Sequence, residues 1–359
     1  MGYIHENNQV SFVRSQLRLW QSVFIAVIVC GLLCWLVLIG PLYSSLPSIG
    51  NDLEIRLLTQ NIRFDNKFPG HGEQPWVVRK KRLINSLDFN TNSKNSIICL
   101  QEALHHQIID VLAGLNNNNP VDEEWTYYGV GRTDGKLEGE FAPILYKASA
   151  WTVVESSTFW LSETPFVPSV GWDAVLPRIV TKLVLKSKEN PMVEISFFNT
   201  HFDHVGKVAR RHSAQFIAEM MKAESKSRPS FLCGDLNTEP TEEPYQILTE
   251  SGFKDSRILV NKDFSYGFES TFTGFDRQNE ESRIIDYIWA SANAKKYYKG
   301  KSKSLSQLYH VAIRQFGILA NYYKGFHFSD HRPVVANYRI SRSKLFKNNK
   351  GDVSNDPSR

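Results

Sequence analysis

VEISFFNTH (193–201) and SFLCGDL (230–236) are the most informative stretches of this sequence for its fold class. Both are short runs rich in Ile, Val, Phe and Leu, a composition typical of buried β-strands. Between them, the stretch 207–226 ends in AEMMKAESK, a good helix former, shortly before Pro229. Strand, helix and strand are therefore expected in succession near the middle of the chain.

The same alternation extends outward in both directions. Short apolar runs bounded by Gly, Asn, Asp and Pro alternate with polar helical stretches, and no repeat or linker-like break interrupts them. We therefore predict one α/β domain over 53–338, in which sheets pack between helices. Further strands are expected at 55–62, 96–101, 142–147, 179–185, 284–290 and 333–338, and further helices at 76–89, 103–114 and 241–251.

Composition excludes several classes of protein. Hydrophobic residues make up 42% of the 359 residues and charged residues 22%, which is average for a globular protein and excludes wholesale disorder and fibrous repeats. Four cysteines are too few for a disulfide scaffold. The net charge of +5 is too small to indicate nucleic-acid binding by bulk electrostatics alone.

An apolar run near the N-terminus predicts a membrane anchor. No charged residue occurs between Arg18 and Asp52, and residues 20–42 are long enough to span a hydrocarbon core of roughly 30 Å. We therefore expect a short cytoplasmic segment at 1–19 and a single transmembrane helix at 20–42. A cleaved signal peptide normally has a shorter apolar core, and a buried core helix is the remaining alternative.

The charges that flank this run predict its orientation. Arg14 and Arg18 precede it, whereas Asp52 and Glu54 are the first charges after it. The positive-inside rule then places the N-terminus in the cytoplasm and the large domain in a lumen or outside the cell. The absence of any N-x-[ST] sequon opposes a lumenal position in a eukaryote.

Two basic stretches lie toward the C-terminus. Residues 339–359 are polar and basic and end in GDVSNDPSR, which predicts a basic disordered tail. A lysine-rich cluster at 295–303 is either a solvated loop or a surface that meets anionic lipid or a phosphate backbone.

Polar residues interrupt the ends of the apolar runs and indicate a site. A carboxylate or imidazole at a strand end lies at the rim of a sheet, where several such groups can converge. The carboxylates are hard oxygen ligands suited to Mg²⁺ or Mn²⁺, and the His and Asn side chains suit a phosphate. The set therefore predicts metal-assisted phosphoryl hydrolysis. Its members are Asn61, Glu102, His201, Asp235, Asn237, Asp330 and His331.

Six segments, in this order, resemble the motifs of the endonuclease/exonuclease/phosphatase superfamily. That superfamily contains DNases, apurinic endonucleases, deadenylases, neutral sphingomyelinases and inositol polyphosphate 5-phosphatases. The resemblance implies a four-layer α/β/β/α sandwich, DNase-like, with the site at one end. The segments are LTQNIRFD (58–65), CLQEAL (99–104), FNTHFDH (198–204), CGDLNTEP (233–240), IIDYIW (284–289) and SDHRPV (329–334).

The resemblance also implies a role for each matching residue. Glu102 resembles the principal metal-binding residue, with Asn61 beside it and Asp330 near the metal. Asp235 resembles the carboxylate that orients or deprotonates the attacking water, and Asn237 the amide that holds the scissile phosphate. The remaining matches are His331 as the phosphate-binding His, Asp286 as its orienting partner, and His201 as a candidate for leaving-group protonation or phosphate contact.

A middle segment resembles a bacterial and fungal subgroup of the superfamily. It contains VGRTDGKLEGEFAPILY (130–146) and FWLSETP (159–165). Three glycines between 131 and 139 suggest a mobile loop. Candidate substrate-binding residues are Arg63, Arg132, Glu140 and Arg178, although Arg132 and Glu140 are equally able to pair with each other. Trp160, Phe166 and Trp172 either stack on a substrate or pack in the core.

Taken together, these observations predict a membrane-anchored phosphoesterase that depends on Mg²⁺ or Mn²⁺ and uses direct in-line attack by water. The alternative is a non-catalytic, membrane-tethered binding module with the same fold. The substrate, a mono- or diester, is either nucleic acid or a lipid or inositol phosphate, although the inositol 5-phosphatase signature is missing. No obligate protein partner is evident. HxxH spacing at His201 and His204 does not converge on a strand end, so zinc is not expected.

Overall fold

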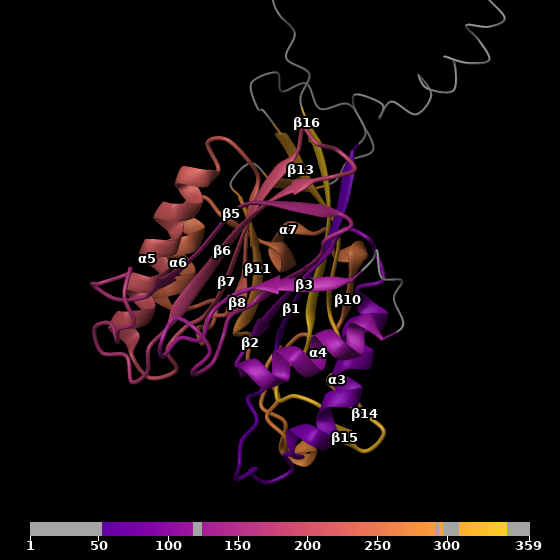
Figure 1. Cartoon of the computed structure of the whole chain (residues 1–359), viewed down its shortest axis with the longest axis vertical. Coiled ribbons are helices and arrows are strands. Elements are labelled where there is room, and N and C mark those ends of the chain that lie inside the picture. Colours follow the sequence, from indigo (N-terminus) through magenta and orange to yellow (C-terminus); the bar gives the residue numbers. More distant parts are fainter. Residues whose placement is uncertain (1–51, 118–123, 292–293, 297–308, 343–359) are drawn as a thin grey trace, which may run out of the picture. The chain divides into compact units, whose positions relative to one another are not determined.

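Two large mixed β-sheets form the framework of the domain (Figure 1). The computed structural model describes residues 52–117, 124–291, 294–296 and 309–342. Apolar strands of both directions alternate with helices along the chain, so the structure confirms the predicted α/β class.

The first sheet has the order β10-β13-β16-β1-β2-β4-β3, with β12 paired to β13. At its centre β1 pairs parallel to β2 and antiparallel to β16, so β1 and β2 end at the same edge. Its strands are β1 (Leu53–Asn61), β2 (Ser96–Gln101), β3 (Trp125–Tyr128), β4 (Ile144–Lys147), β10 (Ser265–Gly267), β12 (Ala294–Lys296), β13 (Tyr309–Ile318) and β16 (Val334–Arg342).

The second sheet has the order β5-β6-β7-β8-β11-β9. β7 pairs parallel to β8, with His201 opposite Asp235, and β11 pairs antiparallel to β8, with Asp286 opposite Asp235. This register brings three polar residues to one edge. The strands are β5 (Trp151–Trp160), β6 (Ile179–Ser187), β7 (Glu194–His201), β8 (Ser230–Asp235), β9 (Lys254–Asp255) and β11 (Asp286–Ala290).

Helices cover the outer faces of both sheets. α3 and α4 pack through Leu83 and Ile108 on the first sheet, and α5 and α6 pack through Ile217 and Leu248 on the second. The remaining short elements are α7, η3, η4 and a small hairpin. The bounds are α3 (Trp76–Asn90), α4 (His105–Asn116), α5 (Lys207–Glu224), α6 (Glu243–Glu250), α7 (Ser256–Leu259), η3 (Lys262–Phe264), η4 (Arg277–Asn279), β14 (Tyr322–Tyr323) and β15 (Phe326–His327).

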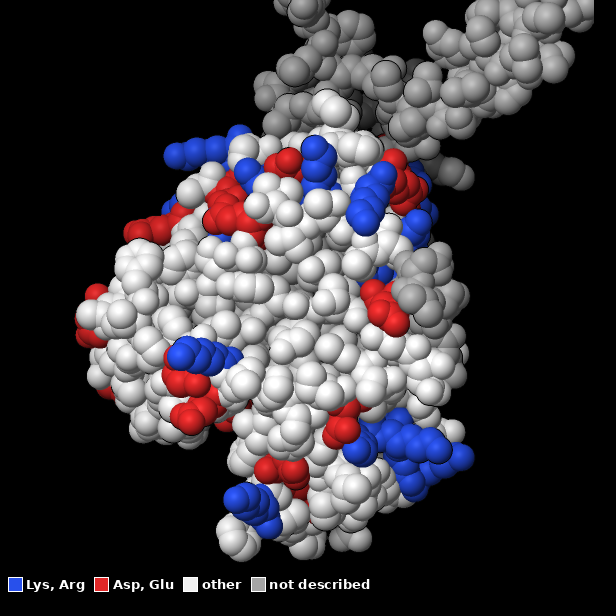
Figure 2. Space-filling model, in the orientation of Figure 1, with Lys and Arg blue, Asp and Glu red and all other residues white. Residues whose placement is uncertain are grey.

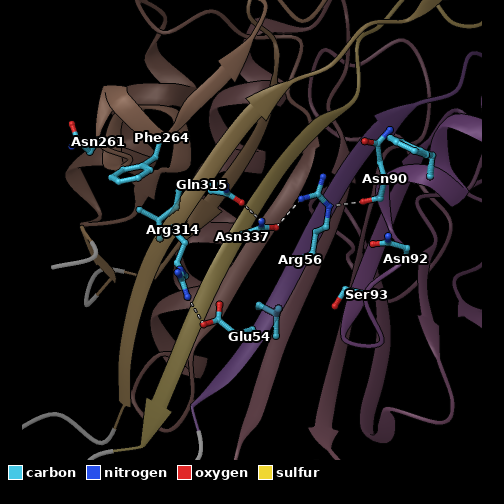
Figure 3. A pocket seen from close by; sticks show the side chains of 13 residues that line it. Glu54, Arg56, Asn90, Asn92, Ser93, Asn261, Phe264, Arg314, Gln315 and Asn337 are labelled. Carbon is cyan, nitrogen blue, oxygen red and sulfur yellow. Dashed lines mark hydrogen bonds and ion pairs between the residues drawn. The ribbon is translucent and has the colours of Figure 1, made fainter. Parts of the chain in front are cut away.

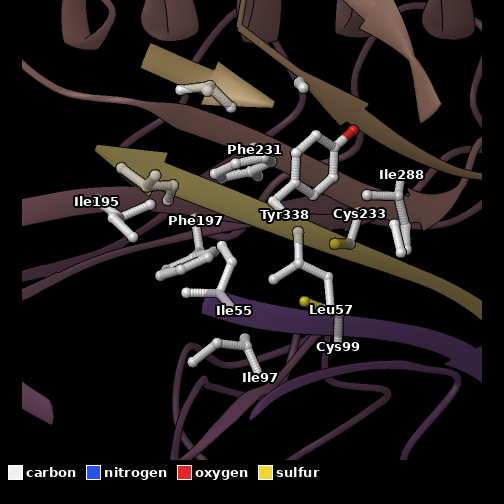
Figure 4. Close-up of a cluster of buried hydrophobic side chains, with 14 of the residues drawn as sticks. Ile55, Leu57, Ile97, Cys99, Ile195, Phe197, Phe231, Cys233, Ile288 and Tyr338 are labelled. Carbon is white, nitrogen blue, oxygen red and sulfur yellow. The ribbon is translucent and has the colours of Figure 1, made fainter. Parts of the chain in front are cut away.

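The main hydrophobic core lies between the two sheets (Figure 4). Leu57 and Cys99 from the first sheet meet Phe197, Phe231 and Cys233 from the second, and all five are fully buried. Burial of this much apolar surface is the main force that holds the sheets face to face. Together with the outer helices, this arrangement is consistent with the expected α/β/β/α sandwich.

The predicted helices and strands are present, with ends shifted by a few residues. Two ten-residue strands, β5 and β13, were not predicted. β5 is an edge strand whose middle residues are largely exposed, so it lacks the apolar run used to identify the others. β13 alternates between buried and half-buried residues and includes a register shift near Gln315.

The C-terminal end of the domain lies a few residues beyond the predicted residue 338. β16 continues to Arg342, paired with β13, so residues 339–342 belong to the sheet and not to the predicted tail. The predicted segment 1–19, the predicted anchor 20–42 and the rest of the tail lie outside the described residues. Within the described residues, no helix combines the length and apolar character needed to cross a membrane.

Candidate active site

Three residues link the ends of the two sheets. Asn61 ends β1, Glu102 follows β2, and Asp235 ends β8. The side-chain amide of Asn61 donates one hydrogen bond to Glu102 Oε1 and one to Asp235 Oδ2, both at 3.0 Å. Because all three are buried, these bonds hold the carboxylates in fixed positions.

A buried ion pair stands beside them. His331 Nδ1 lies 2.9 Å from Asp286 Oδ2, and its Nε2 lies 3.7 Å from Asp235 Oδ2. Burial alone would lower the pKa of His331, but the carboxylates of Asp286 and Asp235 outweigh it and raise the pKa to about 10. His331 is therefore a cation at neutral pH.

The second histidine behaves in the opposite way. His201 Nε2 lies 3.5 Å from Asp235 Oδ2, and its Nδ1 lies 3.7 Å from Glu140 Oε2. Burial and the positive charge of Arg178 lower the pKa of His201 to about 3. His201 is therefore neutral at physiological pH.

Asn237 fixes the tautomer of that neutral imidazole. Its amide nitrogen lies 3.0 Å from the carbonyl of Phe202 and 3.0 Å from His201 Nε2. With both amide hydrogens donated in this way, His201 Nε2 accepts and Nδ1 carries the hydrogen. Both hydrogens of Asn237, predicted to hold a phosphate, thus have acceptors within the protein.

Backbone strain is concentrated at this edge. Arg63, Glu102 and Asn237 have φ angles of 58°, 56° and 44°, which lie in the left-handed region that non-glycine residues rarely occupy. Such conformations cost energy and cluster at functional sites, where the surrounding structure enforces them. Here the Asn61 Oδ1 bond to the Arg63 amide and the Asp235 Oδ1 bond to the Asn237 amide, both at 2.9 Å, provide that enforcement.

The acidic residues fit a divalent cation. Burial, with the nearby negative charge of Glu102, raises the pKa of Asp330 to about 6. The negative charges of these carboxylates are therefore costly here, and a bound cation would offset that cost. Oxygen donors of this kind suit Mg²⁺ or Mn²⁺, which commonly take one or two carboxylates and keep several waters. Among the described residues, Asp235, Asp286 and His331 also lie close enough to share an ion. His331 is protonated and paired with Asp286, however, so Glu102 and Asp330 are the better candidate ligands. The predicted role of Asn61 as a ligand fits less well, because its amide nitrogen donates to Glu102 and its Oδ1 accepts from the Arg63 amide.

Two of the predicted substrate-binding residues, Arg63 and Arg178, already have partners within the protein. Arg63 donates to Glu73 Oε1 at 3.1 Å and lies 3.7 Å from Glu102. Arg178 contacts Asp203 Oδ2 at 3.3 Å and His204 Nδ1 at 3.1 Å.

Arg132 and Glu140 pair with each other at 2.8 Å, which is the alternative that the sequence left open. The glycine-containing loop around them is held by several hydrogen bonds within the loop. The Gly131 amide donates to Lys136, that of Arg132 to Glu140, and that of Thr133 to Glu138. These bonds define one conformation of the loop, and its mobility stays a prediction.

A cavity of about 360 Å³ opens over these residues. Three predicted residues do not line it but contact residues that do: Asn61 behind Glu102, Asp286 behind His331, and Arg132 behind Glu140. The other nine line the cavity directly: Arg63, Glu102, Glu140, Arg178, His201, Asp235, Asn237, Asp330 and His331.

Several residues that line the cavity were not predicted to bind substrate. Phe272 packs edge-on against His331, with ring centroids 4.9 Å apart, and forms β-bridges to both His331 and Arg283. Arg283 in turn donates to Glu239 Oε1 at 3.1 Å. Phe272 and Arg283 lie in an irregular segment whose sequence has no helical or strand periodicity. Their place at the cavity follows only from the isolated β-bridge between Phe272 and His331 of the SDHRPV motif. The other unpredicted lining residues are Phe64, Leu176, His204 and Ile285.

A larger cavity, of about 620 Å³, lies on the exposed face of β13, β16 and β1 (Figure 3). It is lined by paired polar groups, among them Arg56 with Asn337 and Arg314 with Glu54. None of the predicted site residues lines it. Size alone therefore does not identify the site, and the chemistry of the lining residues favours the smaller cavity.

Comparisons with known proteins agree with the fold. A family model described as "Endonuclease/Exonuclease/phosphatase family" matches residues 58–331. A solved structure described as a protein of that family, from Bacteroides thetaiotaomicron, is 31% identical, with a TM-score of 0.68, covering 80% of this chain and 98% of that one. A search of curated proteins gave no significant match.

Two further solved structures are informative. A mannosyl-6-phosphatase from Bacteroides thetaiotaomicron is 32% identical, with a TM-score of 0.67, covering 79% of this chain and 99% of that one. The human Nocturnin catalytic domain, solved with a bound sulfate anion, is 18% identical, with a TM-score of 0.55, covering 82% of this chain and 98% of that one, and shows the fold alone. On the family match and these identities, the chain belongs to the endonuclease/exonuclease/phosphatase family.

Proposed function

We propose that this protein hydrolyses a phosphomonoester of a small organic molecule by in-line attack of water. The observation that carries the proposal is the row Asp286–His331–Asp235 at the base of the cavity. A permanently cationic His331 donates from Nε2 to a phosphate oxygen and stabilises the charge that develops there. Asp235, within reach of the same phosphate, orients the attacking water.

A divalent cation, Mg²⁺ or Mn²⁺, completes this proposal. Glu102 and Asp330 would hold it, and the Asn61 amide would orient Glu102 through its hydrogen bond to Oε1. When bound, the cation would polarise the phosphate and compensate its negative charge. The rest of the chemistry belongs to the chain itself, because Asp235 positions the water and His331 the phosphate.

The neutral state of His201 limits its proposed role. A group with a pKa of about 3 carries almost no transferable proton at pH 7. Protonation of the leaving group, one of its two predicted roles, is therefore disfavoured in this arrangement. We propose instead that His201 positions Asn237 through their hydrogen bond.

Two observations favour a small substrate over a nucleic acid. The cavity is at the small end of the range for ligand pockets, and a nucleic-acid strand needs a longer cationic groove. On the face shown in Figure 2, Lys and Arg occur in small groups beside acidic residues, and the described residues form no continuous basic band there. Similarity to a mannosyl-6-phosphatase favours a phosphomonoester.

We further propose that residues 20–42 anchor the protein in a membrane with a single pass. The N-terminus would be cytoplasmic and the catalytic domain lumenal or extracellular, as the flanking charges predict. Protease protection of the full chain in sealed vesicles tests this orientation, because the domain should be digested on one side only.

An activity assay of the full chain tests the main proposal. Turnover would be measured with Mg²⁺, Mn²⁺ or EDTA against hexose 6-phosphate, aryl phosphates, aryl phosphodiesters, inositol phosphates, sphingomyelin, and single- and double-stranded nucleic acids. We expect metal-dependent turnover of a phosphomonoester, lost in Asp235→Asn and His331→Ala. Gln315→Ala, in the larger cavity, is the matched control and should retain activity. A folded, metal-binding protein with no turnover would favour the binding-module alternative.

A further inference from the structure

An apolar surface adjoins one side of the catalytic cavity. Within residues 166–176, five large apolar side chains are exposed, and Phe166 is 79% exposed. Soluble proteins usually bury such residues, and a local concentration of them marks an interaction site. We name this surface the apolar rim, and its residues are Leu137, Phe166, Val167, Val170, Val175, Leu176 and Val205.

Hydrogen bonds hold the apolar rim in a fixed shape. The Leu161 amide donates to the Arg178 carbonyl at 2.7 Å, which closes the base of the loop. Inside it, the hydroxyls of Ser162 and Ser169 lie 2.6 Å apart. These side chains therefore stay exposed although the backbone that carries them is ordered.

Neighbouring segments join the same surface. The amides of Val175 and Val205 both donate to the carboxylate of Asp203, which brings the two residues together. Gly135, two residues before Leu137, leaves room for Trp160, because a Cβ atom at this position would lie 3.1 Å from that ring. The apolar rim therefore draws on three segments, of which two share the carboxylate of Asp203.

The apolar rim continues into the cavity. Leu176 belongs to both, and the cavity wall also includes Phe64, Phe272 and Ile285. The charged and hydrogen-bonding groups, among them Asp235 and His331, lie at the strand ends. A molecule whose phosphate meets those groups would bring the remainder of its structure against apolar side chains.

We propose that the apolar rim binds a hydrocarbon or aryl group of the substrate, so that the substrate is an amphiphilic phosphoester. This inference rests on the proposed function. Removal of such a group from water onto Leu176, and onto the exposed apolar side chains of the loop that carries it, is favourable by the hydrophobic effect.

A chain-length series tests the proposal with the full-length protein. The substrates are 4-methylphenyl, 4-butylphenyl and 4-hexylphenyl phosphate and their methyl diesters, used below micelle-forming concentrations. Their phenol leaving groups have nearly equal acidity, so differences in kcat/KM report apolar contact. Each buried methylene should raise kcat/KM by roughly fourfold, and the series should span at least about tenfold.

Phe166→Ser/Val170→Ser should flatten this series and leave turnover of the methyl compound unchanged. Val170→Ser/Val205→Ser is a second variant in case the first does not fold. Phe89→Ser is the matched control, because Phe89 is 82% exposed but lies on α3. It should retain the full dependence on chain length.

The outcomes separate this inference from the proposed function. A flat series in the wild type, with hexose 6-phosphate turned over as well or better, would overturn the apolar rim as a substrate site and leave the phosphoesterase intact. A flat series accompanied by dimers that Phe166→Ser/Val170→Ser dissociates would overturn it in favour of an interface between two copies. Absence of turnover for every compound would overturn the proposed function itself.

Discussion

His201 and His331 both lie within 4 Å of the same oxygen of Asp235 but have opposite charge states. His331 has an acidic partner at 2.9 Å and a pKa of about 10. His201 has its nearest acidic neighbours at 3.5 and 3.7 Å, lies close to the charge of Arg178, and has a pKa of about 3. Burial lowers the pKa of both imidazoles, and the outcome depends on what opposes it. The carboxylates of Asp286 and Asp235 outweigh burial at His331, whereas at His201 burial dominates and Arg178 adds to it.

The largest expected effect comes from removing each histidine in turn. His331→Ala removes a cation from the developing charge and should lower kcat by about a hundredfold to a thousandfold. His201→Ala removes a neutral hydrogen-bond partner of Asn237 and should lower kcat by only about tenfold. Steady-state assays of both variants check this. Equal losses would contradict the division of roles between the two residues.

Asp286→Asn should bring the pKa of His331 closer to that of His201. Without the carboxylate, the pKa of His331 falls toward its ordinary value of about 6.5. The cation needed for activity is then lost as pH rises above that value, whereas the wild type retains it until about pH 10. The pH profile of kcat/KM measures this difference, and NMR titration of the imidazole assigns it. Coincident profiles would show that Asp286 does not control His331.

Arg178→Gln tests how far the charge of Arg178 lowers the pKa of His201. Burial would still lower the pKa of His201, but the repulsion from the guanidinium would be gone, so its pKa should rise from about 3. NMR of the His201 ring should then show titration at a higher pH than in the wild type, with a loss of about tenfold in kcat/KM if Arg178 also binds phosphate. Arg56→Gln, in the larger cavity, is the control and should leave His201 unchanged.

The smallest effect concerns stability. Because the folded-state pKa of His331 is raised, its contribution is fully present below about pH 6.5 and is lost as pH rises toward 10. The melting temperature of the wild type should therefore fall by a few degrees between pH 7 and pH 9. Asp286→Asn should show a shallower fall over the same range in calorimetry, and parallel curves would contradict the assigned pKa.

The sequence was sufficient to predict the strand ends but not the contacts between them. Asn61, Glu102 and Asp235 can be recognised in the sequence because each lies at the end of an apolar run. The motifs that contain them also follow one another in the order found in a known family. The hydrogen bonds that link them cross from one sheet to the other, and a linear sequence carries no direct sign of that packing.

The residues that sequence reasoning missed have a common physical reason. Phe272 and Arg283 reach the cavity through isolated β-bridges to the segment that carries His331, and isolated bridges leave no periodic pattern. The apolar rim was also not foreseen, since Phe166 was considered only for stacking or for the core. Exposure depends on the whole fold, and no local feature of FWLSETP distinguishes an exposed Phe from a buried one.

The path of β1 has a practical consequence. This strand enters the domain at Leu53 and finishes among the catalytic candidates at Asn61. Whatever is joined upstream, whether a lipid-embedded segment, an affinity tag or a solid support, is attached at the end remote from the cavity mouth. Immobilising the protein through residues that precede Leu53 should therefore leave the opposite end of β1, where Asn61 lies, accessible to a ligand.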